Sequence, residues 1–173
     1  ALKSISSNIH NGELVAVMGR NGAGKSSLLK VLAGVNKPDA GSVHIVGQDP
    51  FVLHGKKRRG AIGFIPQEPS DLLYGQSVKI ECQQADRDNE LESGTTYAVL
   101  QQLVPGLSES THPRDLSEGQ RLGLALSVVL SSNPSVLILD EPTNDLDVET
   151  LELLEDILEQ YQGTVILVSH DRE

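Results

Sequence analysis

Residues 19–26 read GRNGAGKS, a stretch that matches the pattern G-x-x-x-x-G-K-[ST]. The apolar run 13–18, ELVAVM, comes directly before it and is typical of a buried strand. Residues 25–32 follow as a run of helix formers, and Gly34 is placed as a helix C-cap. The sequence therefore predicts a strand, a glycine-rich turn and a helix in direct succession.

The composition of this turn indicates phosphate binding. Glycines let backbone N–H groups curl around phosphate oxygens, and the following helix points its positive N-terminus at the same anion. Lys25 can reach the terminal phosphates, and the Ser26 hydroxyl can coordinate Mg²⁺. Chance produces this pattern in well under about 1% of chains of average composition. The predicted phosphate-binding residues are Gly19, Asn21, Gly22, Ala23, Gly24, Lys25, Ser26 and Ser27.

Strands and helices are expected to alternate along the rest of the chain. Apolar runs predict strands at 42–46, 61–65, 136–139 and 164–169. Helices are predicted at 117–131, where Ser117 and Gln120 form a capping box, and at 148–161. This alternation favours an α/β fold of the phosphate-loop NTPase kind, with a mainly parallel sheet flanked by helices.

Residues 71–115 differ from this pattern. They are mostly polar, carry no long apolar run and contain two weak helical stretches at 77–85 and 95–104. We predict a small helical insertion here, within a single domain that spans residues 1–173.

Composition limits the range of functions. The chain has 173 residues and a net charge of −10, so we expect no direct nucleic-acid binding through phosphate contacts. The basic run 56–59, KKRR, is interpreted as a solvated turn between strands. A single cysteine, Cys82, excludes a disulfide framework or a cysteine-based zinc site.

Two acids follow the apolar strand 136–139. Ligands of parallel sheets bind at the carboxyl ends of the strands, so Asp140 and Glu141 are expected beside the bound phosphates. Asp140 can hold Mg²⁺ through its water shell, and Glu141 can polarise an attacking water. Ser26 and Asp140 are therefore predicted metal-site residues, and Glu141 a predicted catalytic residue.

His170 and Gln67 follow two other strands, so both are expected at the same edge of the sheet. His170 could touch the γ-phosphate or steady Glu141 and the water. Gln67 could ligate Mg²⁺ or the water without adding charge. Both are predicted catalytic residues, and Gln67 is also a predicted metal-site residue.

Six motifs together resemble the nucleotide-binding domain of ATP-binding cassette (ABC) proteins. Residues 19–26 resemble Walker A, and 64–67 (FIPQ) the Q-loop. Residues 116–120 (LSEGQ) resemble the signature motif, and 136–141 (VLILDE) resemble Walker B with its catalytic Glu. Residues 144–147 (NDLD) resemble the D-loop, and 169–171 (SHD) resemble the segment of the switch histidine.

The resemblance implies an ATPase that uses Mg²⁺ and works in pairs. Two such domains, identical or different, would join head to tail, with each ATP between the Walker A of one and the signature of the other. Ser117, Gly119 and Gln120 would then contact the γ-phosphate, and Asp147 would couple the two sites. Glu118 replaces the first Gly of the signature and is expected to face solvent.

The resemblance also implies a truncated domain. The aromatic residue that stacks on adenine lies well upstream of Walker A in this family, and none of the first 18 residues is aromatic. The chain also stops at Glu173, before the last expected elements of the sheet.

Two branches of the family are resembled. Residues 18–143, especially 66–74 and 112–116, are similar to energy-coupling-factor and cobalt-type importer ATPases. In those proteins the helical insertion holds a transmembrane subunit at the cytoplasmic face of the membrane. From Asn144 onward, 144–151 and 168–172 are similar to the ABC-F class, soluble tandem ATPases that act on ribosomes or DNA. We favour the importer, because partner choice is expected in the insertion. The alternatives are an ABC-F ATPase and a non-enzymatic nucleotide-binding fragment.

Overall fold

A computed structural model describes residues 4–142 and 148–168, which fall into two compact units. Unit 1 comprises residues 1–67, 134–144 and 161–173, and unit 2 comprises 68–133 and 145–160. Each unit has its own cluster of buried apolar side chains. The clusters are predominantly aliphatic, as expected for a chain with only 3% aromatic residues.

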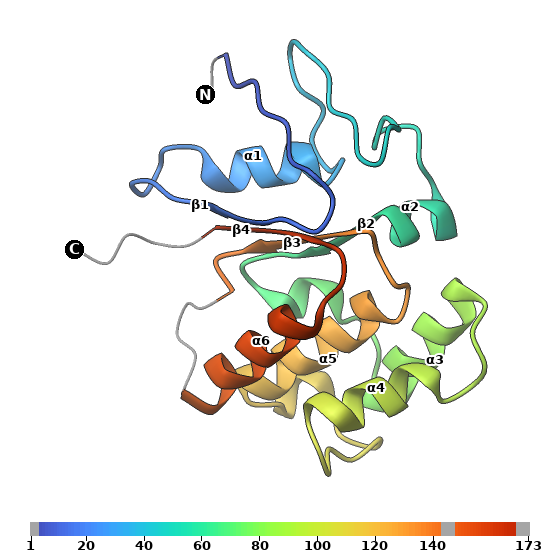
Figure 1. Cartoon of the computed structure of the whole chain (residues 1–173). Helices are drawn as coiled ribbons and strands as arrows, with labels where there is room; N and C mark the ends of the chain where they lie inside the picture. The colour runs from blue at the N-terminus through green and yellow to red at the C-terminus, as the bar shows by residue number, and fades with distance from the viewer. Residues whose placement is uncertain (1–3, 143–147, 169–173) are drawn as a thin grey trace. The chain divides into compact units, whose positions relative to one another are not determined.

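In the part of the chain that the structure describes, unit 1 is built on a four-stranded sheet (Figure 1). Neighbouring strands are parallel throughout, in the order β1-β4-β3-β2. The strands are β1 (Leu14–Val17), β2 (Ile62–Ile65), β3 (Val136–Asp140) and β4 (Thr164–Val168). This topology confirms the predicted α/β fold with a mainly parallel sheet, and it brings the carboxyl ends of all four strands to one edge.

Helix α1 (Lys25–Leu32) packs on this sheet and positions the glycine-rich turn (Figure 1). Leu29 and Ala33, four residues apart, are both fully buried and belong to the same apolar cluster as Ile138 of β3 and Ile166 of β4. Because these aliphatic contacts fix α1 against the sheet, they also fix the turn that leads into it.

The predicted strand at 42–46 is wrong. Within the described residues, this segment forms one isolated antiparallel bridge, between Ile45 and Gln48. Val46 and Gly47 adopt φ angles of +50° and +73°, so the backbone turns sharply where the strand was expected to continue. The apolar character of this run is explained by the burial of Ile45 in the core and not by pairing with a neighbouring strand.

The basic run 56–59 lies in a helix rather than the predicted turn. Helix α2 (Gly55–Ala61) includes all four basic residues and leads directly into β2. Arg58 donates a hydrogen bond from its guanidinium to the Ala33 carbonyl at 2.8 Å, beyond the end of α1. This contact between distant parts of the chain is one that local propensity does not reveal.

Unit 2 is helical. Its α-helices are α3 (Val78–Asn89), α4 (Thr95–Leu103), α5 (Glu118–Leu130) and α6 (Val148–Gln160), and its 3₁₀ helices are η1 (Pro69–Leu72) and η2 (Pro113–Asp115). Helices α3 and α4 both fall within 71–115. The limits of the predicted insertion stay a prediction, since unit 2 also includes α5 and α6.

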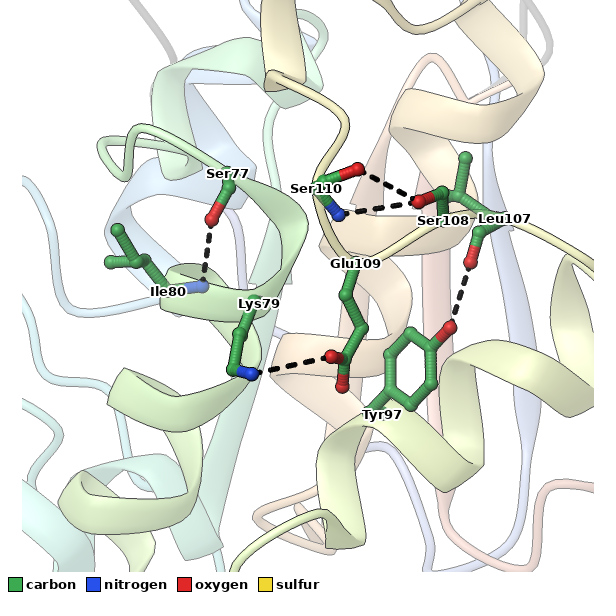
Figure 2. Close-up of polar contacts among 8 residues, drawn as sticks. All are labelled: Ser77, Lys79, Ile80, Tyr97, Leu107, Ser108, Glu109 and Ser110. Carbon is green, nitrogen blue, oxygen red and sulfur yellow. Dashed lines mark hydrogen bonds and ion pairs between the residues drawn. The ribbon is translucent and has the colours of Figure 1, made fainter.

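Polar contacts hold α3 and α4 to the loop that follows them (Figure 2). The Ser77 hydroxyl accepts a hydrogen bond from the Ile80 amide at 3.3 Å and so caps α3. Lys79 lies 3.5 Å from the Glu109 carboxylate, and the Tyr97 hydroxyl donates to the Leu107 carbonyl at 2.9 Å. The loop is therefore fixed to both helices.

Asp86 caps α4 from a distance. Its carboxylate is 3% exposed and accepts hydrogen bonds from the Gly94 amide at 2.7 Å, the Thr96 amide at 2.8 Å and the Thr96 hydroxyl at 2.6 Å. Gly94 occupies the N-cap of α4 and has no side chain of its own to satisfy these groups. The burial of a carboxylate here is explained by this set of donors.

Across the residues with a described structure, none of the helices combines the length and apolar character that crossing a membrane requires.

Candidate functional site

The turn between β1 and α1 has the backbone that phosphate binding needs. Gly22 and Gly24 adopt φ angles of +78° and +95°, which a residue with a side chain rarely adopts. Gly24 is the N-cap of α1, and no side chain caps this end of the helix. The first N–H groups of α1 are therefore free of a side-chain acceptor and can face an anion.

Lys25 holds its charge close to the turn. Its side chain is 7% exposed, and Nζ donates hydrogen bonds to the Gly19 carbonyl at 2.7 Å and the Arg20 carbonyl at 3.2 Å. Since an ammonium group has three donors, one remains for a ligand oxygen. The cation is thus placed beside the loop before any ligand arrives.

Ser26 and Asp140 meet beside this lysine. The Ser26 hydroxyl donates to Asp140 Oδ1 at 2.9 Å, which links the first turn of α1 to the last residue of β3. Asp140 is 2% exposed. The parallel register places Asp140 opposite Val168, so the end of β4 reaches the same edge.

Burial raises the pKa of the Asp140 carboxyl, and the hydrogen bond from Ser26 partly opposes this shift. A cation beside this carboxylate would favour its ionised form. Within residues 4–142 and 148–168, no group of three or more His, Cys, Asp or Glu side chains is arranged to hold a metal. One carboxylate and one hydroxyl instead fit Mg²⁺, which takes few protein ligands and is held largely by phosphate and water oxygens.

A cavity of about 580 Å³ opens beside these groups, with predominantly polar walls. Glu141 lines it from the end of β3, with its φ at +53°. A non-glycine residue in this region is uncommon, and such residues cluster at functional sites. The lining residues are Asn21, Gly22, Gly24, Lys25, Ser26, Ser27, Gln67 and Glu141.

Charge is unevenly divided between the units. Unit 1 contains 10 basic and 7 acidic residues, for a net charge of +3, whereas unit 2 contains 4 basic and 17 acidic residues, for −13. The overall acidity of the chain is therefore a property of unit 2. A polyphosphate that enters the unit 1 cavity meets a part of the chain that is net positive.

The structure brings most of the predicted unit 1 residues together. Gly19 and Ala23 contribute to the turn itself, since the Gly19 carbonyl accepts from Lys25 and the Ala23 amide donates to the Arg20 carbonyl at 3.1 Å. Asp140 joins the cavity residues through Ser26. His170, Asp147 and the rest of 143–147 lie outside the described residues.

Ser117, Gly119 and Gln120 lie in unit 2, at the start of α5. The predicted capping box is present: the Gln120 amide donates to Ser117 Oγ at 3.2 Å, and the Ser117 amide donates to Gln120 Oε1 at 3.0 Å. Because Ser117 Oγ accepts in this box, its hydroxyl hydrogen can still be donated to an anion. Glu118 is exposed, as predicted.

Sequence reasoning missed three features of these motifs. The φ of Glu141, the carbonyl partners of Lys25 and the contact between Gly119 and Thr150 have no local signal in the sequence. Each depends on segments that meet only in the folded chain. The ends of the apolar strands, by contrast, were sufficient to find Asp140, Glu141 and Gln67.

Comparison with protein families gives a match over most of the chain. The model of the family described as ABC transporter matches residues 2–144. This range includes the glycine-rich turn, the Q-loop-like segment, the signature-like segment and the acidic end of β3.

Curated relatives match along the whole chain. A Streptomyces coelicolor protein provisionally named an ABC transporter ATP-binding protein is 47% identical over 176 residues, which cover 100% of this chain and 31% of the relative. The ATP-binding protein Uup of Haemophilus influenzae is 38% identical over 175 residues, which cover 99% of this chain and 25% of the relative. The chain thus spans a third or less of the length of these relatives.

Solved structures share the fold. CbiO1 from Clostridium perfringens, described as part of the ABC transporter complex CbiONQ, is 31% identical with a TM-score of 0.80, over 98% of this chain and 72% of that one. The cassette MJ0796, seen as a post-hydrolysis dimer with ADP and Pi, is 27% identical with a TM-score of 0.78, over 98% of this chain and 80% of that one. The family match, the relatives and the shared fold together show that this chain belongs to the ABC transporter family, as an ATP-binding ABC ATPase domain.

Proposed function

We propose that this domain hydrolyses ATP with Mg²⁺ as the nucleotide-binding part of an energy-coupling-factor or cobalt-type importer. One observation carries the catalytic proposal: Lys25, Ser26, Gln67 and Glu141 line a single cavity, and Asp140 is hydrogen-bonded to Ser26 beside it. Phosphoryl transfer needs charge stabilisation of the phosphates and a positioned water, and this set of residues supplies both.

The glycine-rich turn would bind the phosphates. The backbone from Gly22 to Ser27 offers N–H groups at the start of α1, and Lys25 Nζ lies 2.7 Å from the Gly19 carbonyl at the same turn. Phosphate oxygens would become additional acceptors for this ammonium group, which the loop has already oriented. The role of the turn is therefore to provide directed donors with little rearrangement.

Oxygen atoms of Ser26, Gln67 and Asp140 would hold Mg²⁺. Hydroxyl, amide and carboxylate oxygens are the ligands that this ion prefers, and the buried Asp140 carboxylate gains from a neighbouring cation. The bound ion would offset the negative charge of the phosphates.

Glu141 would polarise the attacking water, with Gln67 orienting the same water and His170 steadying the transition state. The backbone of Glu141, at φ +53°, directs this residue to the cavity wall. Catalysis would consist of positioning and charge stabilisation, with no covalent intermediate on the protein.

Ser117, Gly119 and Gln120 would complete the site of a second domain, identical or related, in a head-to-tail pair. The N-terminus of α5 and the free hydroxyl hydrogen of Ser117 form a second set of anion donors. The opposite net charges of units 1 and 2 favour such an arrangement, since unit 1 of one copy would face unit 2 of the other.

Two relatives bear on the partner. The likeness to CbiO1, over 98% of this chain, supports an importer in which a transmembrane subunit holds the domain at the cytoplasmic face of the membrane. The likeness to Uup, a protein of the ABC-F class, over 99% of this chain favours the alternative, a soluble ATPase that acts on ribosomes or DNA. We favour the importer, without direct nucleic-acid contact.

The catalytic proposal is tested with Glu141→Gln in the full-length protein. Turnover of ATP is expected to fall by roughly 10²- to 10⁴-fold, with ATP binding retained, because the amide cannot accept the proton of the water. Glu13→Gln, which changes an exposed carboxylate in the same unit, is the matched control. Equal turnover in the wild type and Glu141→Gln would remove Glu141 from the mechanism.

Purification of the full-length protein from the organism that produces it distinguishes the importer from the soluble ABC-F alternative. A stoichiometric membrane subunit, recovered in detergent, supports the importer. The other outcome is that ribosomes co-purify with the protein, and that more of them do so in the presence of ATP and with the Glu141→Gln variant. That result would overturn the importer and establish the soluble alternative.

A further inference from the structure

In unit 2, the first turns of α5 and α6 meet at Gly119 and Thr150. A methyl group on Gly119 would collide with Thr150 Oγ1 and lie 3.2 Å from Cβ and 3.3 Å from Cγ2 of Thr150. Gly119 lies inside α5, and its φ lies outside the left-handed range. The glycine is therefore required by the close approach of Thr150 and not by its own backbone conformation.

Thr150 is held firmly in this position. It is 6% exposed, and Leu154 and Ile157, four and seven residues further along α6, are also buried. These three residues share one face of the helix. A shift of Thr150 therefore requires a shift of the whole buried face of α6.

The turn that contacts Thr150 is rigid as well. The reciprocal hydrogen bonds between Ser117 and Gln120 close a ring around the first turn of α5, and Gly119 lies within it. Because these hydrogen bonds hold the turn together internally, we expect it to move mainly by tilting as a body. The contact of Thr150 with Gly119 opposes this tilt on the side that faces α6.

We propose that Thr150 is a positioning residue for the anion-binding turn of α5. It sets the direction of the Gly119 amide and the Ser117 hydroxyl toward the nucleotide of a second copy, without touching that nucleotide. The proposal rests on the head-to-tail pairing in the proposed function. Such donors stabilise an anion because they are oriented before the ligand binds. A small displacement of these donors therefore removes much of the stabilisation.

The test uses the full-length protein with Glu141→Gln as the background, so that an ATP-bound pair accumulates. Pair formation is measured by analytical ultracentrifugation over a range of protein concentrations, and ATP binding to the unpaired protein is measured with a fluorescent ATP analogue. Thr150→Ala removes the two atoms beyond Cβ that approach Gly119, Oγ1 and Cγ2, and Thr150→Ser keeps the hydroxyl against Gly119. Leu154→Val weakens the packing of the same helix face away from Gly119 and is the matched control.

Thr150→Ala is expected to raise the concentration needed for pairing by about tenfold or more, because misdirected donors are costly. Binding of ATP to the unpaired protein stays unchanged, and Thr150→Ser restores pairing to within about threefold. Leu154→Val is expected to lower the Tm as much as Thr150→Ala does. It is expected to pair at the same protein concentration as the Glu141→Gln background.

Two outcomes overturn the positioning role. In the first, the Thr150→Ala variant pairs at the same protein concentration as the background. In the second, Leu154→Val weakens pairing in proportion to the decrease in its Tm. A background protein that binds ATP but never pairs would overturn the pairing itself, and with it the role of Thr150. A background protein that does not bind ATP would overturn the proposed function at the unit 1 cavity instead.

Discussion

Ser26 donates its hydroxyl hydrogen to the Asp140 carboxylate across 2.9 Å, although 114 positions separate the two residues in the chain. This hydrogen bond joins the helix that follows the phosphate-binding turn to the strand that ends at the acidic pair. In the proposed site, Ser26 and Asp140 would both help to hold Mg²⁺. The hydrogen bond keeps these two side chains together in this structure.

Asp140→Asn is expected to raise the Mg²⁺ concentration required for half-maximal ATP hydrolysis by at least about tenfold, because a neutral amide attracts the cation less. Titration of activity with Mg²⁺ at saturating ATP measures this. Asp39→Asn, an exposed change in the same unit, should leave the titration in place. An unchanged Mg²⁺ requirement in Asp140→Asn would remove this carboxylate from the metal site.

Lys25→Ala is expected to weaken ATP binding and to lower turnover by roughly 10²- to 10³-fold, as for the loss of one oriented donor at a developing charge. Lys30→Ala, in the last turn of the same helix and exposed, is the control. Equilibrium binding of a fluorescent ATP analogue and steady-state turnover give the two readouts. If both variants behave alike, the buried ammonium group has no special role.

Asp86→Ala is expected to lower the free energy of unfolding by about 1–3 kcal/mol, because it leaves the buried Thr96 hydroxyl and two amides without their acceptor. Asp88→Ala changes an exposed carboxylate on the same helix and should cost within about 0.5 kcal/mol. Urea denaturation followed by circular dichroism provides the comparison. Equal losses in the two variants would contradict the capping role of Asp86.

Glu81 makes part of the stability pH-dependent. Burial raises the pKa of this carboxyl above its ordinary value of 4.5, although backbone hydrogen bonds from Gly75 and Tyr74 oppose the shift. The folded state therefore holds its proton to a higher pH than the unfolded state does. The stabilising contribution is complete below pH 4.5 and is lost as the pH rises through the folded-state pKa.

Glu81→Gln removes this titration. The free energy of unfolding of this variant minus that of the wild type is expected to increase as the pH rises above 4.5 and then to level off, because only the wild type loses stability when Glu81 ionises. Urea unfolding at a series of pH values measures the difference, with the exposed Glu92→Gln as the control. A difference that stays constant with pH would show that Glu81 titrates alike in both states.

Local sequence patterns predicted the parts of the fold that depend on neighbouring residues. The strand before residue 19, the helix from Lys25 and the capping box of α5 each have their signal within a few positions. The acidic pair was found because an apolar strand ends at Leu139 and the next two residues are acids. These predictions needed no knowledge of which strands are neighbours.

Long-range contacts account for what local patterns missed. Arg58 reaches the Ala33 carbonyl, and helix α2 forms where a turn was expected. The 42–46 segment turns at Val46 instead of extending. Thr150 approaches Gly119, which only the packing of two helices reveals. In each case tertiary packing overrides a local preference.

The strand order has a consequence for how the nascent chain folds. Among residues 4–142 and 148–168, β1 pairs with β4 and with no other strand, so Leu14 must wait for Val165 to leave the ribosome before this ladder forms. Parallel pairing between strands that are distant in sequence forms slowly, and an apolar strand is prone to aggregation until it is paired. The glycine-rich turn is thus synthesised well before the strand that completes the sheet beside it.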